Sequence, residues 1–107
     1  MRYIKESDWK HLRQLKPVLL DRYCRQILSE VERIASKHEE ASHPRYLAMY
    51  RVVQDRDREL GGMFNDMRRS SAIEQIFLLR RNGVFTDDEF AGFSDDIKDV
   101  IARLENL

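Results

Sequence analysis

The chain has 107 residues, of which 42% are apolar and 36% are charged, with only four glycines and two prolines. Nineteen basic residues balance nineteen acidic ones, so a general electrostatic attraction to nucleic acid or to an anionic membrane is not expected. The composition is rich in helix formers and poor in turn formers, which indicates an all-α domain. A single cysteine and the lack of any stretch near the roughly 18 apolar residues of a membrane span lead us to expect a cytoplasmic protein without a membrane anchor.

Two helices are predicted in the first third of the chain. A short helix can be capped by Ser7 or Asp8 and runs to about Leu15. Pro17 then fits the first turn of a second helix, where its missing N–H removes no hydrogen bond. This second helix carries one apolar row, on which Cys24 is expected to be a small hydrophobic residue rather than a nucleophile. The row consists of Leu20, Cys24, Ile27, Val31 and Ile34.

The longest predicted helix runs from about Pro44 to about Arg69. A short polar turn separates it from the preceding helix, which favours an antiparallel pair. Gly61-Gly62 interrupts the pattern and costs the helix about 1.5–2 kcal/mol relative to two alanines. The glycines indicate either a kink or break, or the close approach of a neighbouring backbone.

Two helix-start patterns follow, with a helix stop between them. Ser71–Glu74 and Thr86–Glu89 each place a hydroxyl at a cap and a carboxylate three residues later, as in a capping box. Asn82-Gly83 supplies the stop, because glycine readily takes the left-handed conformation that closes a helix. The segment after Thr86 is either one helix to the C-terminus or is divided by a separate start at Ser94.

These elements predict an all-α bundle of five or six helices in a single domain, residues 1–107. Residues 1–16 form an N-terminal arm with a short helix, residues 17–70 a long antiparallel helix pair, and residues 71–107 a C-terminal helical hairpin.

The hairpin over residues 72–93 resembles the SHOCT module, a short helical hairpin found at bacterial protein C-termini. The resemblance is carried by Ile76, Leu79 and the run Gly83-Val84-Phe85-Thr86-Asp87-Asp88-Glu89-Phe90. Phe85 departs from the aliphatic residue of the module, and Ala91-Gly92-Phe93-Ser94-Asp95 replaces its lysine-rich run. The resemblance implies a role in interaction or oligomerisation, without chemistry and without site residues.

Two carboxylate–imidazole pairs have the spacing of metal ligands on one helix face. Asp8 and His11 form the first pair, and Glu40 and His43 form the second. A di-iron bundle needs two such pairs and two further glutamates in one core, whereas Glu40 and His43 fall in a turn beside Pro44. We therefore predict no metal and no cofactor.

Asp57 is the polar residue that stands out. On a helical wheel it falls between Val53 and Leu60, inside the apolar stripe. A carboxylate in that position must pair, stay hydrated or raise its pKa. A salt bridge with a neighbouring arginine is one explanation, and a metal-binding or enzymatic carboxylate is the alternative.

A helix-turn-helix reading makes the protein a small nucleic-acid-associated regulator. Arg68, Arg69, Arg80 and Arg81 would then contact phosphates. The second helix of the hairpin, however, begins with Asp87-Asp88-Glu89, which a DNA groove would repel. These acidic residues disfavour the nucleic-acid alternative, and nucleic acid is not expected as a partner.

Aromatic and methionine side chains mark the long helix as a candidate interaction surface. The candidate residues are Tyr46, Met49, Tyr50, Met63, Phe64 and Met67. A straight helix from residue 44 to residue 69 reaches about 39 Å, more than a compact chain of this size covers. We therefore expect a non-enzymatic interaction or scaffold protein that forms a homodimer or binds another protein through this surface.

Overall fold

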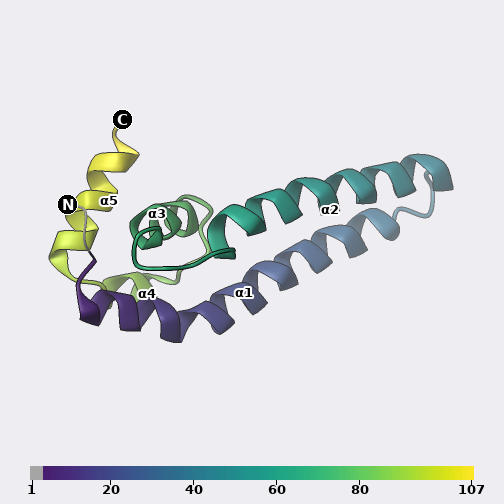
Figure 1. Cartoon of the computed structure of the whole chain (residues 1–107). Helices are drawn as coiled ribbons and strands as arrows, with labels where there is room; N and C mark the ends of the chain where they lie inside the picture. The colour runs from purple at the N-terminus through teal and green to yellow at the C-terminus, as the bar shows by residue number, and fades with distance from the viewer. Residues whose placement is uncertain (1–3) are drawn as a thin grey trace.

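A computed structural model describes residues 4–107, so the first three residues of the predicted N-terminal arm lie outside the described part. Five helices make up the described chain, which confirms the all-α class (Figure 1). They are α1 (Glu6–Ala35), α2 (Ser42–Phe64), α3 (Ala72–Arg81), α4 (Asp87–Ala91) and α5 (Asp95–Glu105). Residues 4–107 contain no β-strand and no helix that is both long and apolar enough to cross a membrane.

The two helices predicted around Pro17 are one helix, so the predicted break is wrong. Pro17 lies inside α1, where the carbonyl four residues earlier loses its N–H partner at a cost of about 3 kcal/mol. Leu12 and Leu19, on either side of the proline, are both fully buried, so packing on a common core outweighs the local cost. The α1 ribbon bends in its N-terminal part (Figure 1). The predicted caps are also wrong, because Lys5 is the N-cap residue.

Helix α2 continues through Gly61-Gly62, and it ends at Phe64 rather than at Arg69. The glycines therefore do not break the helix. A Cβ built on Gly62 would lie 3.7 Å from Leu78 Cδ1, so α3 packs beside this turn at ordinary contact distance. The helix ends because Asn65 is extended (ψ 143°) and Asp66 takes the left-handed conformation (φ 56°).

The predicted stop after α3 is confirmed as a Schellman motif. Gly83 has a φ of 66°, its N–H donates to Arg80 O at 3.1 Å, and Val84 N–H donates to Leu79 O at 3.0 Å. Val84 and Leu79 are both fully buried, which supplies the apolar contact that accompanies this motif.

The predicted starts after Ser71 and Thr86 are confirmed, the alternative with a separate start at Ser94 is the one observed, and the capping box expected at Ser71 is wrong. Thr86 caps α4 in a complete capping box with Glu89, and Ser94 caps a separate helix α5. Ser71 is the N-cap residue of α3, but its side chain makes no capping hydrogen bond. Its backbone is α-helical (φ −106°, ψ −3°), and its hydroxyl instead contacts the preceding turn, accepting from Arg68 N–H at 3.2 Å.

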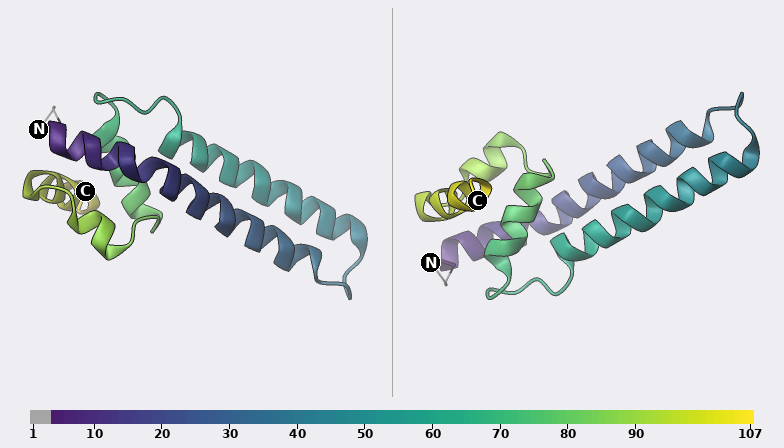
Figure 2. Two further views of the ribbon diagram at one scale, coloured as in Figure 1. Left: turned by 90° about the horizontal axis from the view of Figure 1, so that it is seen from below. Right: turned by 90° about the horizontal axis from the view of Figure 1, so that it is seen from above.

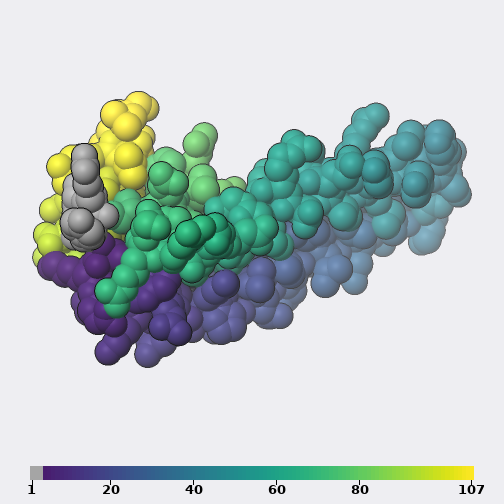
Figure 3. All heavy atoms as spheres, viewed as in Figure 1, coloured from purple at the N-terminus to yellow at the C-terminus, as the bar shows by residue number. Residues whose placement is uncertain are grey.

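The core lies at one end of an elongated molecule that measures 51 × 26 × 23 Å. Helices α1 and α2 run side by side in opposite directions, and α3, α4 and α5 pack near the N-terminal end of α1 (Figures 1 and 2). No residue between positions 24 and 62 is fully buried. We call residues 24–62 the arm; it projects beyond the rest of the molecule (Figure 3).

Two glycine-to-alanine substitutions test this description of the helices. Gly83→Ala forces a side chain into the left-handed region and is expected to lower the free energy of unfolding by about 1–2 kcal/mol. Gly62→Ala lies in a helix interior with room for a Cβ and is expected to raise it by up to about 1 kcal/mol. Urea denaturation followed by circular dichroism measures both. Equal effects of the two substitutions would contradict the assignment of the stop to Gly83.

Candidate interaction surface

A polar network joins the two helices of the arm where the arm leaves the core. Tyr23 OH donates to Glu59 Oε2 at 2.6 Å, and Arg56 reaches both Glu59 (2.9 Å) and Glu30 (3.2 Å). Desolvation and the Glu59 carboxylate raise the pKa of Tyr23 to about 12, and the Tyr23 and Arg56 hydrogen bonds lower the pKa of Glu59. Tyr23 therefore remains a neutral donor and Glu59 a charged acceptor at neutral pH, which fixes the register of α1 against α2.

The far end of the arm is closed by Arg45. Its guanidinium donates to the carbonyl oxygen of Ala35, the last residue of α1, at 2.6 Å. A cation at a helix C-terminus satisfies an unpaired carbonyl and complements the helix dipole. The turn between α1 and α2 is thus closed by a contact between residues ten positions apart.

An apolar stripe runs along the exposed side of α2. Tyr46 is 62% exposed, Tyr50 51% and Val53 48%, and the spacing of four and three residues places them on one face. The two tyrosine rings stack with centroids 6.4 Å apart, and Gln54 Nε2 donates to Tyr50 OH at 2.9 Å. On α1, Leu28 is 62% exposed. We call Tyr46, Tyr50 and Val53 the α2 stripe.

The candidate surface residues do not all lie on this stripe. Tyr46 and Tyr50 are exposed, whereas Met63 and Phe64 are buried in the core. Met49 and Met67 are half-buried, and Met67 packs against the core. The C-terminal part of the predicted surface is therefore core, because α3 covers the last turn of α2.

Asp57 lies in the row of Val53, as the wheel indicates, but this row faces solvent rather than a core. The residue is exposed, and no ion pair involves it among the described residues. The row of α2 that faces α1 includes Val52, Arg56 and Met63, so Asp57 lies about 100° around the helix from Arg56. The prediction that Asp57 is a buried carboxylate in a salt bridge is wrong, because the neighbouring residue Arg56 occupies the face of α2 toward α1.

The buried carboxylate of the described chain is Asp8. It is 1% exposed, accepts from Ser94 N–H at 2.7 Å and from Ser94 Oγ at 2.6 Å, and so holds the N-cap residue of α5 against α1. Sequence reasoning missed this role, although Asp8 continues the buried row of Leu12 and Leu19 at helical spacing.

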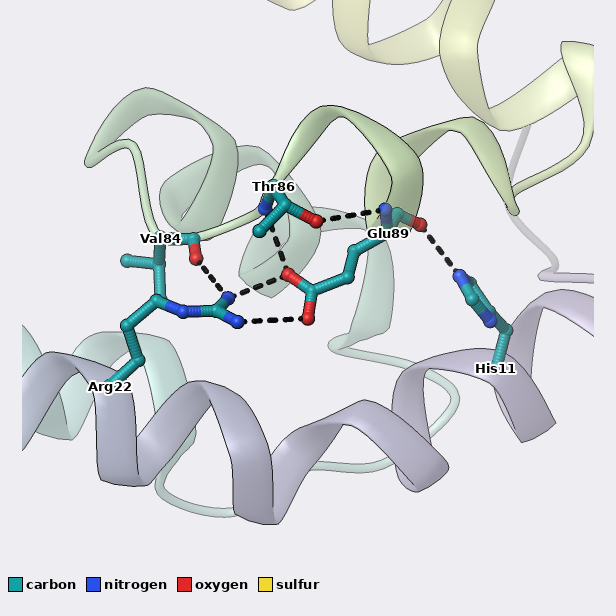
Figure 4. A network of polar contacts seen from close by, with 5 residues as sticks. All are labelled: His11, Arg22, Val84, Thr86 and Glu89. Carbon is teal, nitrogen blue, oxygen red and sulfur yellow. Dashed lines mark hydrogen bonds and ion pairs between the residues drawn. The ribbon is translucent and has the colours of Figure 1, made fainter.

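A second polar contact holds α4 against α1, as Figure 4 shows. Arg22 forms a two-pronged ion pair with Glu89, with nitrogen–oxygen distances of 2.6 and 3.1 Å, and also donates to Val84 O at 2.8 Å. The same Glu89 accepts from Thr86 N–H at 2.8 Å. Nearer the N-terminus of α1, His11 Nε2 lies 2.7 Å from Glu89 O, so both the side chain and the backbone of Glu89 contact α1.

The two carboxylate–imidazole pairs have different surroundings. Asp8 and His11 are engaged with Ser94 and Glu89, as described above, and Glu40 and His43 are exposed at the turn of the arm. Within residues 4–107, no group of three or more histidine, cysteine or acidic side chains has the geometry of a metal site. Cys24 is half-buried in α1.

The four candidate phosphate-binding arginines do not form one surface group of free cations. Arg68 pairs with Asp66, and Arg69 pairs with Glu6 at the start of α1. Arg80 lies over the ring of Phe90, with its guanidinium carbon 4.2 Å from the centroid. Arg81 is exposed. Helix α4, which would follow the turn of a helix-turn-helix, has only five residues.

A surface depression of about 460 Å³ lies on the α1 side of the arm. Arginines supply much of its lining, but most are paired: Arg22 with Glu89, Arg25 with Asp21, and Arg56 with Glu30 and Glu59. Its charge is therefore largely balanced, and little attraction for an anion remains.

No family model, no curated protein and no solved structure matches this chain. The resemblance of residues 72–93 to the SHOCT module stays a prediction.

Asp8 and Asp57 make a matched pair for testing which carboxylate supports the fold. Asp8→Asn removes a buried charge that accepts two hydrogen bonds and is expected to lower the free energy of unfolding by about 1–3 kcal/mol. Asp57→Asn alters an exposed group and is expected to change it by less than about 0.5 kcal/mol. Urea titration of both variants gives the comparison, and a larger effect at Asp57 would contradict the assignment.

The Arg22–Glu89 pair predicts a loss of stability in acid. The Arg22 hydrogen bonds, with the Thr86 N–H, hold the pKa of Glu89 below its ordinary value of about 4.3. Because the folded-state pKa is the lower one, the stabilisation is complete above the unfolded-state pKa and is lost as the pH falls through the folded-state pKa. The free energy of unfolding should fall as the pH drops below the ordinary glutamate pKa of about 4.3, and it should fall less steeply in Glu89→Gln. Identical slopes for the variant and the parent protein would contradict this role.

Proposed function

We propose that this chain is a non-catalytic helical interaction protein that presents the outer face of its arm to a protein partner. The observation that carries the proposal is the α2 stripe: three neighbouring large apolar side chains, each about half exposed, on a helix pair that no third layer covers. Contiguous exposed apolar side chains of this kind mark interaction sites in soluble proteins, and tyrosine is enriched among them.

The rest of the molecule supports a scaffold role for the C-terminal helices. Three side chains of the kinds that act in catalysis or metal binding instead hold α4 and α5 on α1. They are Asp8, His11 and Glu89. These contacts fix the base from which the arm projects. A rigid base and a projecting aromatic surface are the parts that an adaptor protein needs.

Site-specific photo-crosslinking in the cells that naturally produce this protein tests the proposal. A photoreactive phenylalanine derivative at position 50 is expected to give a discrete crosslinked species, because the Tyr50 ring points away from the core. The same amino acid at position 51 is the matched control, since Arg51 is also exposed but lies about 100° around the helix.

Products at position 50 that are absent at position 51 would support the interaction surface, whatever the mass of the partner. No product at position 50, or the same products at both positions, would contradict it.

A further inference from the structure

The α2 stripe has a polar end as well as an apolar centre. Continuing the spacing of four, three and four residues from Tyr46 through Tyr50 and Val53 leads to Asp57, which is exposed and makes no ion pair within the described chain. The row therefore carries a phenol hydroxyl at one end and a carboxylate at the other. The distance between the two ends along the helix axis is about 16 Å.

We propose that the stripe docks a second copy of this chain, with the two α2 helices antiparallel about a two-fold axis that crosses them between Arg51 and Val52. This proposal rests on the proposed function, and it names the partner and the geometry. In this arrangement Tyr50 of one copy packs on Val53 of the other. The same axis places the hydroxyl of Tyr46 opposite the carboxylate of Asp57.

The antiparallel arrangement is selected by complementarity along the row. Both pairs, 50 with 53 and 46 with 57, are satisfied by one axis, and each occurs twice because the interface is isologous. A phenol hydroxyl that donates to a carboxylate makes a charge-assisted hydrogen bond. A parallel pairing would instead place Asp57 against Asp57, and like charges at that distance repel.

Three properties of the chain favour a second copy over an unrelated partner. The row is complementary to itself when reversed, which an arbitrary partner would have to match by coincidence. The net charge is zero, so two copies do not repel each other as a whole. An ordinary interface removes about 800 Å² per partner, which is close to a tenth of the 7326 Å² surface of this chain.

Self-association of the purified protein is the first test. The protein is expected to sediment as a dimer, and Tyr50→Asp is expected to weaken dimerisation at least tenfold, because it places a carboxylate at the centre of the apolar contact. Arg51→Asp makes the same charge-introducing change one residue away, off the row, and is expected to leave the dimer intact. Circular dichroism confirms that both variants are folded. A monomeric parent protein, or equal effects of the two variants, would overturn the proposal.

Disulfide trapping tests the direction of the helices. In a Cys24→Ser background, a mixture of the single variants Tyr50→Cys and Val53→Cys is expected to form a crosslinked heterodimer under mild oxidation. Each single variant alone is expected to crosslink poorly, because positions 50 and 53 oppose each other rather than themselves. Efficient crosslinking of either single variant alone would show parallel helices and overturn the proposal.

The two proposals fail in different ways. A monomeric protein whose position 50 crosslinks in cells to a protein of another mass would overturn the dimer and keep the interaction surface. A monomer without any product specific to position 50 would overturn both.

Discussion

The ion pair between Arg22 and Glu89 is the contact on which the arrangement of the C-terminal helices depends. It joins the middle of α1 to the first turn of α4, and both side chains are largely buried. Glu89 is already oriented by its capping-box contact with Thr86, so pairing with Arg22 orders few additional rotamers. Asp8 repeats this solution at the next helix start, because it accepts from the N-cap residue of α5. The carboxylates of Glu89 and Asp8 therefore each bind the start of a short helix and at the same time hold that helix against α1.

Docking at this end of α1 leaves the other end uncovered. A helix of 30 residues is about 45 Å long, and the three short helices after α2 cannot cover it. The radius of gyration is 16.5 Å, whereas a compact chain of this length has about 13 Å. The elongated shape therefore follows from the continuity of α1 through Pro17. If the helix had broken at the proline, its halves could have folded onto one core.

The features that the sequence predicts correctly are those decided within four or five residues. The left-handed Gly83 and the capping box at Thr86 each depend on neighbouring atoms alone. The failures involve tertiary packing. Pro17 is predicted to begin a second helix because its missing N–H removes no hydrogen bond there, yet packing on both sides carries one continuous helix through it. Asp57 is predicted to lie inward because it shares a row with apolar side chains, but that row, with Tyr46, Tyr50 and Val53, faces solvent. Treating residues 6–35 as one helix places Asp8 in the buried row. Its partner Ser94 cannot be predicted from the spacing of residues, because it lies 86 positions away in the sequence.

The arm has its polar and apolar groups in an unusual arrangement, and this bears on what the arm is for. Arg56, Glu59 and Tyr23 connect α1 to α2 through charged hydrogen bonds, which specify register but give little net stability once desolvation is counted. Large apolar side chains, Tyr50 and Leu28 among them, lie instead on exposed surface. The apolar surface of the arm can contribute its full free energy only when something outside the monomer removes it from water. The stability of the arm and its binding are therefore expected to be coupled, since a partner that covers the stripe also stabilises the helix pair that presents it.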